Sequence, residues 1–273
     1  MIILEPSVSL YECGDDLEAH IARCASVCYD SSPKDNKRLC EHLWRSGHRS
    51  MFRHTTRYYM IPPGKEHVIS KLSPFTHVVM HYAYAGSPAS RTYVNDVPVF
   101  VAYVASNGQA YEENDKEYLR EEWRIPAEKA PESIRRYTIE CVTSIDISRE
   151  LNRVSPNAIA ESSTRLIIYG TKKRPDLPIL KTVFADEDPE RWEDSLRKFK
   201  IDEEYYFSLL KKGYPVDYAR KHLPLGTATK VVYTYTRREW DEIFRKRVDG
   251  ETGEPHADAK DVMTKARDLL DKQ

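Results

Sequence analysis

The 273-residue chain has few glycines and no glycine-rich phosphate loop. It contains 10 glycines against 16 prolines, and neither G-x-G-x-x-G nor G-x-x-x-x-G-K-[ST] occurs in it. Such loops hold phosphates with backbone N–H groups that glycines leave accessible. If this protein binds a phosphate, we therefore expect side chains to bind it.

The sequence also lacks a strong net charge, a long apolar run and a secretion signal. The formal net charge is −1, which provides no basic field for a nucleic-acid duplex. No segment approaches the ~18 apolar residues of a membrane span, and the first residues contain neither a basic n-region nor a small-residue cleavage site. We expect a cytoplasmic protein with no nucleic-acid or membrane partner.

The cysteines are odd in number and irregularly spaced, which favours reduced thiols over a disulfide framework. The five are Cys13, Cys24, Cys28, Cys40 and Cys141. The histidines His48 and His54 have no acidic partner at metal-ligand spacing, so we predict no metal site.

Hydrophobic periodicity predicts alternating helices and strands. Apolar stripes indicate helices over 15–28 and 35–46, and β-branched and aromatic runs indicate strands over 53–61 and 229–236. Residues 135–151 fit both periods, and we predict a strand followed by a helix from about Asp146. Further along, we predict loops at 171–178 and 184–194, two short helices within 201–224, and helices over 237–247 and at the carboxyl end. The fold class is mixed α/β, with no linker that divides residues 1–273.

One stretch, ELNRVSPNAIAESSTR at 150–165, combines arginine, serine and carboxylate in the order E-x-S-x-R. Guanidinium is a permanently charged, forked donor that suits a phosphate, and a carboxylate suits a sugar hydroxyl. A solvent-exposed helix end would contain similar residues, so the motif alone leaves both interpretations open.

A second group of arginines favours the binding interpretation. Arg220, Arg238 and Arg247 lie on separate predicted elements: a helix, the end of a strand and the next helix. Several separated arginines with few glycines are typical of a protein that holds a phosphate or dinucleotide without a phosphate loop.

These motifs resemble those of the flavin-dependent thymidylate synthases, whose signature reads R-H-R-x7-S-x-R, usually with Glu two residues before the serine. Here Arg153, Glu161, Ser163 and Arg165 stand at the matching positions. The stretch GHRSMFRH resembles the family's H-x-[ST]-x-[FL]-x-H turn, and ARKHLP resembles its A-R-x-x-L-P. The resemblance covers residues of about 15–55, 137–170 and 203–272.

The resemblance implies an α+β fold, with an antiparallel sheet flanked by helices, and a homotetramer with sites between subunits. It implies reductive C5-methylation of a uridine monophosphate, with FAD passing hydride from NADPH and methylenetetrahydrofolate supplying the carbon. The family uses no cysteine nucleophile, and we expect no cysteine beside the site motifs. A nucleotide-binding paralogue without activity is the alternative. A nucleotide hydrolase would need a metal-binding carboxylate cluster that the sequence lacks.

The resemblance also implies a role for each matched residue. Arg220 and Arg247 contact the uracil carbonyls, where positive charge stabilises the enolate-like charge that develops as C5 becomes nucleophilic. The expected substrate-binding residues are Glu150, Arg153, Glu161, Ser163, Thr164 and Arg165. The expected flavin-binding residues are His48, Ser50, Arg153, Ser155, Thr236, Arg238, Glu242 and His256.

The chain departs from the family pattern at several positions. Val154-Ser155 replaces the family's His-Arg, Thr236 replaces an asparagine, and Glu150 stands where glutamine is common. A carboxylate near a phosphate repels it, yet it can accept a hydrogen bond from a ribose 2′-OH. Both dUMP and UMP therefore remain candidates, and so do the relatives of this family that methylate UMP in nucleoside-antibiotic pathways as the group that the chain resembles.

An additional tract at about 62–133 separates His54 from the signature. It contains aromatic and basic residues that could close over the site: His77, His81, Tyr82, Tyr84 and Arg91. Alternatively, the tract enlarges the surface or a subunit contact. The sequence leaves both interpretations open.

Overall fold

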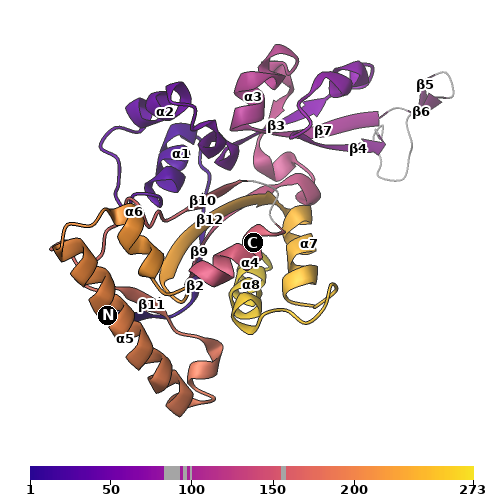
Figure 1. Ribbon diagram of the computed structural model, residues 1–273. Coiled ribbons are helices and arrows are strands. Elements are labelled where there is room, and N and C mark those ends of the chain that lie inside the picture. Colours follow the sequence, from indigo (N-terminus) through magenta and orange to yellow (C-terminus); the bar gives the residue numbers. More distant parts are fainter. Residues whose placement is uncertain (83–92, 95–96, 99, 155–157) are drawn as a thin grey trace.

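The computed structural model describes residues 1–82, 93–94, 97–98, 100–154 and 158–273. Within these residues, helices pack on the two faces of a central four-stranded sheet, and a second four-stranded sheet extends to one side (Figure 1). Antiparallel pairing in both sheets, together with separate helices, confirms the predicted α+β class. None of the described helices has the length and apolar character needed to cross a membrane.

The central sheet has the strand order β10-β12-β9-β2, and every neighbouring pair is antiparallel. Its strands are β2 (Ser7–Tyr11), β9 (Arg136–Ser144), β10 (Ile159–Glu161) and β12 (Ala228–Thr236). The prediction for 135–151 is confirmed, because β9 ends at Ser144 and α4 (Ile145–Asn152) follows at once.

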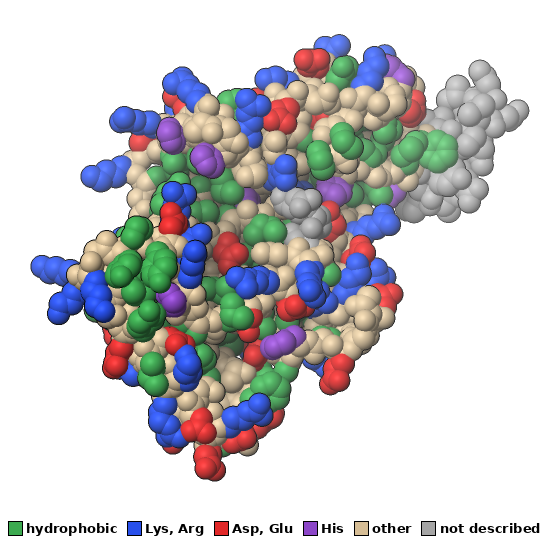
Figure 2. Space-filling model, viewed as in Figure 1, with side chains coloured by type: hydrophobic (Ala, Val, Ile, Leu, Met, Phe, Trp, Pro, Cys, Tyr) green, Lys and Arg blue, Asp and Glu red, His purple; other side chains and the backbone are tan. Residues whose placement is uncertain are grey.

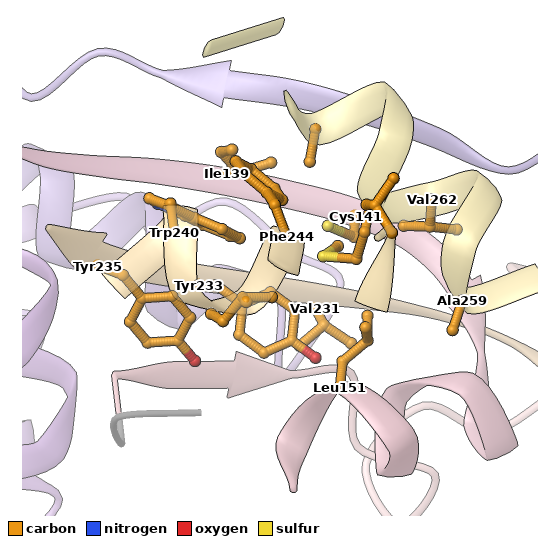
Figure 3. Close-up of a cluster of buried hydrophobic side chains, with 14 of the residues drawn as sticks. Ile139, Cys141, Leu151, Val231, Tyr233, Tyr235, Trp240, Phe244, Ala259 and Val262 are labelled. Atoms are coloured by element: carbon orange, nitrogen blue, oxygen red, sulfur yellow. The ribbon is translucent and has the colours of Figure 1, made fainter. Parts of the chain in front are cut away.

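The main hydrophobic core lies between this sheet and the helices α4, α7 (Arg237–Arg247) and α8 (Ala257–Leu270). Alternate residues of β9 and β12 face these helices, and the aromatic side chains of α7 pack on them (Figure 3). The core side chains labelled in that view are Ile139, Cys141, Leu151, Val231, Tyr233, Tyr235, Trp240, Phe244, Ala259 and Val262.

The opposite face of the sheet is covered by α1 (Leu17–Ser26), next to which α2 (Asn36–Arg45) packs. Both helices were predicted, and both begin with an aspartate whose side chain accepts a backbone N–H, as N-caps do. Gly47 follows α2 with φ of 83°, the left-handed conformation that glycine adopts without strain. The short helix η1 (Arg49–His54) then leads to the second sheet.

The second sheet has the order β4-β7-β3-β8 and is made from the additional tract together with the strand before it. Its strands are β3 (Thr56–Ile61), β4 (His77–Tyr82), β7 (Phe100–Asn107) and β8 (Arg124–Ile125), with α3 (Gly108–Glu113) after β7. The predicted strand at 53–61 is thus present over 56–61, but it pairs with the additional tract rather than with the central sheet. The chain returns to the central sheet at Arg136.

A third region lies below the central sheet in Figure 1. Here β1 (Ile2–Leu4) pairs in parallel with β11 (Pro178–Leu180), and α5 (Pro189–Lys211) and α6 (Val216–Ala219) follow. The predicted loop at 184–194 is wrong from Pro189 onward. Asp188 caps α5 by accepting the Arg191 N–H, and proline occupies the first helical position, a combination that begins helices.

The remaining elements are short. They are β5 (Tyr93–Val94), β6 (Val97–Pro98), η2 (Glu66–Lys71), η3 (Asp115–Glu117), η4 (Glu121–Trp123), η5 (Ala127–Lys129), η6 (Glu132–Ile134), η7 (Val183–Ala185) and η8 (Arg220–His222).

The core between β9 and α7 predicts a large loss of stability on truncation. Ile139 is 0% exposed in the main core, whereas Ile201 on α5 is 61% exposed. Ile139→Ala should lower the free energy of unfolding by about 2–5 kcal/mol, because it removes buried methyl groups and leaves a cavity. Ile201→Ala, the matched control, should change it little. Urea denaturation of both variants checks this, and equal losses would show that Ile139 is not in a close-packed core.

Candidate functional site

The segment after β10 makes a tight turn against α1. The Ser163 N–H donates to the Cys28 carbonyl at 3.2 Å, and the Ser163 carbonyl accepts from the Ile167 N–H at 2.8 Å. This turn directs Thr164 and Arg165 toward the helical segment around α6 and η8. Residues distant in sequence therefore meet at the end of the E-x-S-x-R motif.

Two arginines at this turn share one carboxylate. Asp217 on α6 lies 3.5 Å from Arg165 Nε through one oxygen and 3.6 Å from Arg220 Nε through the other. Arg220 Nη1 also donates to Thr164 Oγ1 at 3.3 Å. The group of Thr164, Arg165, Asp217 and Arg220 is called the Asp217 cluster below.

The Asp217 cluster has the composition of an anion site. Its arginines are exposed, with the Arg165 side chain 67% accessible, so these ion pairs add little to stability. Two guanidinium groups that converge on one carboxylate, with the Thr164 hydroxyl bonded to one of them, would accept a phosphate in place of the carboxylate. Asp217 belongs to none of the sequence motifs described above. The available signal was its position three residues before Arg220, on the same helical turn.

A second arginine cluster forms where α7 ends beside α4. Arg247 donates from Nε and Nη2 to the Glu150 carbonyl at 3.3 and 2.9 Å. The Glu150 carboxylate lies 3.4 Å from Arg153 and 3.9 Å from Arg247. Carbonyls in the last turn of a helix have no partner in the helix, and a cation there is favourable. Arg247, with a side chain only 15% exposed, thus joins α7 to α4.

Glu161, the first residue of the E-x-S-x-R motif, is partly buried. Its Oε1 accepts from Ser148 Oγ of α4 at 2.8 Å and from Thr229 Oγ1 of β12 at 3.2 Å. Burial raises the pKa of Glu161, and hydrogen bonds from Ser148, Thr229 and Asn152 act in the opposite direction. The carboxylate is therefore held in a fixed position by side chains of two elements, α4 and β12.

A cysteine does lie beside the motif, so that expectation was wrong. The carbonyl of Cys28 accepts the Ser163 amide, and its thiol is partly buried. Burial raises the pKa of the Cys28 thiol. Because only the thiolate is a good nucleophile, the raised pKa argues against covalent catalysis by Cys28.

The expected flavin residues on α7 differ in their availability. Thr236 is buried, and its hydroxyl is committed to Glu239, accepting the backbone N–H at 3.2 Å and donating to the carboxylate at 2.9 Å. Glu242 pairs with Lys246 at 2.8 Å. Arg238 is exposed and makes no ion pair within the described residues. Arg238 therefore offers its full set of donors to a ligand.

The other expected flavin residues lie on different elements. His48 precedes η1 and bonds Ser46 at 2.9 Å, Ser50 is exposed on η1, and His256 is exposed at the start of α8. Ser155 lies outside the described residues. Its neighbour Val154 stands where the family has histidine. The Val154 side chain packs against the main core, so this position contributes to packing. No group of three or more potential metal ligands occurs among the described side chains.

The second sheet touches the start of α7. His77 of β4 places Nε2 3.5 Å from a carboxylate oxygen of Glu239, the residue that caps α7. His81 instead contacts the Tyr103 ring within its own sheet. Tyr84 and Arg91 lie outside the described residues, as does the side chain of Tyr82. The two interpretations of the tract, as a cover for the site or as added surface, both remain predictions.

Positive and negative side chains are interspersed on the face of the molecule shown in Figure 2. Both arginine clusters follow this pattern, since each contains a carboxylate that lies between two guanidinium groups. In both clusters the guanidinium charges are thus partly neutralised by a carboxylate of the protein itself.

Comparisons with known proteins agree with the motifs. The family model described as thymidylate synthase complementing protein matches residues 102–272. No curated protein matches the chain. Two solved structures of the UMP/dUMP methylase PolB from Streptomyces cacaoi, bound with 5-Br dUMP and 5-Br UMP, are similar in fold over 100% of this chain. Identities are 14% and 12%, coverage of those chains is 93% and 92%, and both TM-scores are 0.48.

The family match spans β7 to α8 and includes both arginine clusters and the E-x-S-x-R motif. It covers more than half of the chain, and it confirms the resemblance that the motifs indicated. This protein therefore belongs to the thymidylate synthase complementing protein family, the flavin-dependent thymidylate synthases.

Proposed function

We propose that this protein methylates C5 of a uridine monophosphate, either dUMP or UMP. Methylenetetrahydrofolate supplies the carbon, and NADPH supplies the reducing equivalents through FAD. The observation that carries the proposal is the Asp217 cluster in a member of this family: two guanidinium groups share one carboxylate, and one of them also bonds the Thr164 hydroxyl. The enzyme acts as a cytoplasmic homotetramer, with residues 1–273 as one domain.

In this proposal the nucleotide phosphate replaces the Asp217 carboxylate between Arg165 and Arg220. A phosphate carries more negative charge than a carboxylate and has three acceptor oxygens, so it uses the forked donors of both arginines more fully. Ser163 and Thr164 add hydroxyl donors at the same turn. Glu161, held by Ser148 and Thr229, accepts a hydrogen bond from a sugar hydroxyl.

The Glu150 carboxylate bears on the choice between dUMP and UMP. It already pairs with Arg153 and Arg247, so its charge is partly neutralised and repels a phosphate less than an isolated carboxylate would. Its lone pairs can still accept from a 2′-OH. Both nucleotides therefore stay in the proposal, and the assay below compares them.

Arg220, which the resemblance places on the uracil ring, is assigned here to the phosphate because it pairs with Asp217. The residue we assign to the uracil ring is Arg247. Its Nε and Nη2 groups are anchored to the Glu150 carbonyl, while Nη1 has no hydrogen-bond partner among the described residues. A guanidinium fixed in this way directs the remaining N–H groups without reorganisation. It can stabilise negative charge on a uracil oxygen as C5 becomes nucleophilic.

The residues available for FAD fit a dinucleotide with phosphate groups. Arg238 is exposed and lacks an ion pair within the described residues, and His48, Ser50 and His256 are exposed as further donors. FAD held by these residues would supply the hydride-transfer chemistry of the reaction. These candidates lie on η1, α7 and α8, which suits a site completed by a neighbouring subunit.

The proposal is tested by two measurements on the purified protein. Oxidised flavin absorbs visible light, so the spectrum reports whether FAD is bound. Release of tritium from [5-³H]UMP and [5-³H]dUMP, with methylenetetrahydrofolate and NADPH, reports the reaction and the preferred nucleotide. Nucleotide binding without flavin and without tritium release would instead identify the inactive nucleotide-binding paralogue.

Opposite effects are expected from the two kinds of charge in the Asp217 cluster. Arg165→Ala should weaken binding of the nucleotide by roughly 1.5–3 kcal/mol, the range for hydrogen bonds to charged groups. Asp217→Asn should strengthen it, because the competing carboxylate is removed. Titration calorimetry with the nucleotide checks both changes in affinity. Uridine, which has no phosphate, is titrated as well, and its dissociation constant should stay the same in both variants. Arg45→Ala, on the exposed face of α2, is the control. An unchanged dissociation constant in both cluster variants would contradict the phosphate assignment.

A different signature is expected at Arg247. Arg247→Lys keeps the positive charge but loses the planar fork, so the chemical step should slow more than nucleotide binding weakens. Single-turnover rates and nucleotide dissociation constants, measured on the same preparations, separate the two effects. If both change by the same factor, Arg247 contributes only uniform binding and its assignment to the uracil ring is wrong.

Glu161 is predicted to lower stability at neutral pH. Its pKa in the folded state lies above the ordinary value of 4.5. As pH rises above that value the unfolded state loses its proton first, so stability falls until the folded pKa is passed. Glu161→Gln should therefore raise the free energy of unfolding at pH 7 and change it little at pH 4. Urea denaturation at both pH values checks this against Glu128→Gln, an exposed control. If Glu161→Gln raises the free energy of unfolding by the same amount at pH 4 and pH 7, the ionised carboxylate is not the cause of the stabilisation.

A further inference from the structure

A large cleft lies where the second sheet joins the central sheet. It has a volume of about 890 Å³, within the range of small-molecule sites. Its walls are the loop from Tyr11 to Asp15, the start of β9, the start of β3 and the segment around β8. None of the residues assigned above to nucleotide or flavin lines it, so the cleft is separate from the proposed active site.

The guanidinium of Arg136 lies at the floor of this cleft. Nη1 donates to the Thr55 carbonyl at 3.1 Å and to Thr56 Oγ1 at 3.0 Å, and Nη2 donates to the Thr234 carbonyl at 2.9 Å. Nε is buried and has no hydrogen-bond partner. No carboxylate among the described residues lies within ion-pair distance of Arg136, and Glu239 favours its charged form only from beyond that distance.

The groups beneath Arg136 are neutral. A hydrogen-bonded chain runs from His20 to Thr138 at 3.1 Å, from Thr138 to Thr234 at 2.8 Å, and from Thr234 to His54 at 2.8 Å. Burial lowers the pKa of His54 to about 3, and it also lowers the pKa of His20. These imidazoles are uncharged at neutral pH, so they neither compensate the guanidinium nor compete with it for an anion.

The acidic residues that line the cleft do not compensate Arg136 either. Glu121 pairs with Arg124 at 3.0 Å. Glu12 and Asp15 are exposed on the opposite loop and form no ion pair among the described residues. A buried cation without a paired charge is unfavourable, and an anion that binds beside it removes this penalty.

We propose that this cleft binds a small organic anion whose carboxylate or phosphate group pairs with Arg136. The positive charge of the Arg136 guanidinium attracts the anionic group, and its buried Nε is the N–H that has no partner within the protein. Leu10, Tyr58, Ile125 and Pro126 line the walls and contact the organic part. Because β3 and β8 form one wall, the site exists only where the second sheet meets the central sheet. A bound anion would therefore contact both sheets at their junction.

Cys13 provides a local test of this proposal. It lines the cleft and is exposed, whereas Cys28 is partly buried beside the Asp217 cluster. Iodoacetamide alkylation of Cys13, followed by peptide mass spectrometry, should slow in a saturable way when sodium phosphate or citrate is added at constant ionic strength. The more effective of the two anions identifies a phosphate or a carboxylate as the preferred group. Alkylation of Cys13 that is independent of both anions would overturn the proposal.

Two variants locate the anion. Arg136→Met should weaken protection of Cys13 at least tenfold. Arg136 also bonds Thr55 and Thr234, so its replacement removes structural hydrogen bonds as well as charge. A second variant, Gly14→Phe, keeps Arg136 and fills the cleft instead. The added side chain has room, because a Cβ at Gly14 meets nothing within 4 Å. Gly14→Ala is its matched control and should keep full protection.

Arg165→Ala, in the Asp217 cluster, should leave protection of Cys13 unchanged whether or not the proposed methylation is correct. Protection that persists in Gly14→Phe, or that disappears in Arg165→Ala, would place the anion elsewhere and contradict the proposal.

Discussion

The antiparallel pairing of β9 with β12 is the contact on which the rest of the structure depends. It runs without a break from Ala228 opposite Ser144 to Thr236 opposite Arg136. Since β9 continues directly into α4 and β12 directly into α7, the two helices begin at opposite ends of the same strand pair. A helix of eleven residues is about 16 Å long, so α7 returns along the sheet and brings Arg247 to the end of α4.

The same pairing separates apolar from polar side chains. Side chains alternate across a sheet, so Ile139 and Tyr233 face the main core while Thr138 and Thr234 face α1 and the second sheet. The register places Thr138 directly opposite Thr234, which allows their hydroxyls to bond at 2.8 Å. A shift by one residue would place these threonines in the main core and the apolar residues on the polar face.

Two charged groups are buried against this framework, and they are accommodated differently. Glu161 accepts hydrogen bonds from α4 and β12, which partly offset the loss of water around its carboxylate. Arg136 is bonded mainly to backbone carbonyls and lacks a paired carboxylate among the described residues. Buried ionisable groups of this kind lower stability and are therefore expected mainly where a ligand uses them.

Local sequence determined most of the secondary structure, because periodicity and capping act within a few residues. The strand and helix of 135–152, the caps of α1 and α2 and the long strand β12 all followed from such patterns. The E-x-S-x-R motif and the separated arginines likewise indicated an anion site from side-chain chemistry alone. Tertiary structure decided the partners, since contacts between distant residues depend on strand order and helix direction. It paired β3 with the additional tract, placed Asp217 between Arg165 and Arg220, and bound Arg247 to the carbonyl of Glu150, a residue of another helix that no local pattern could have specified.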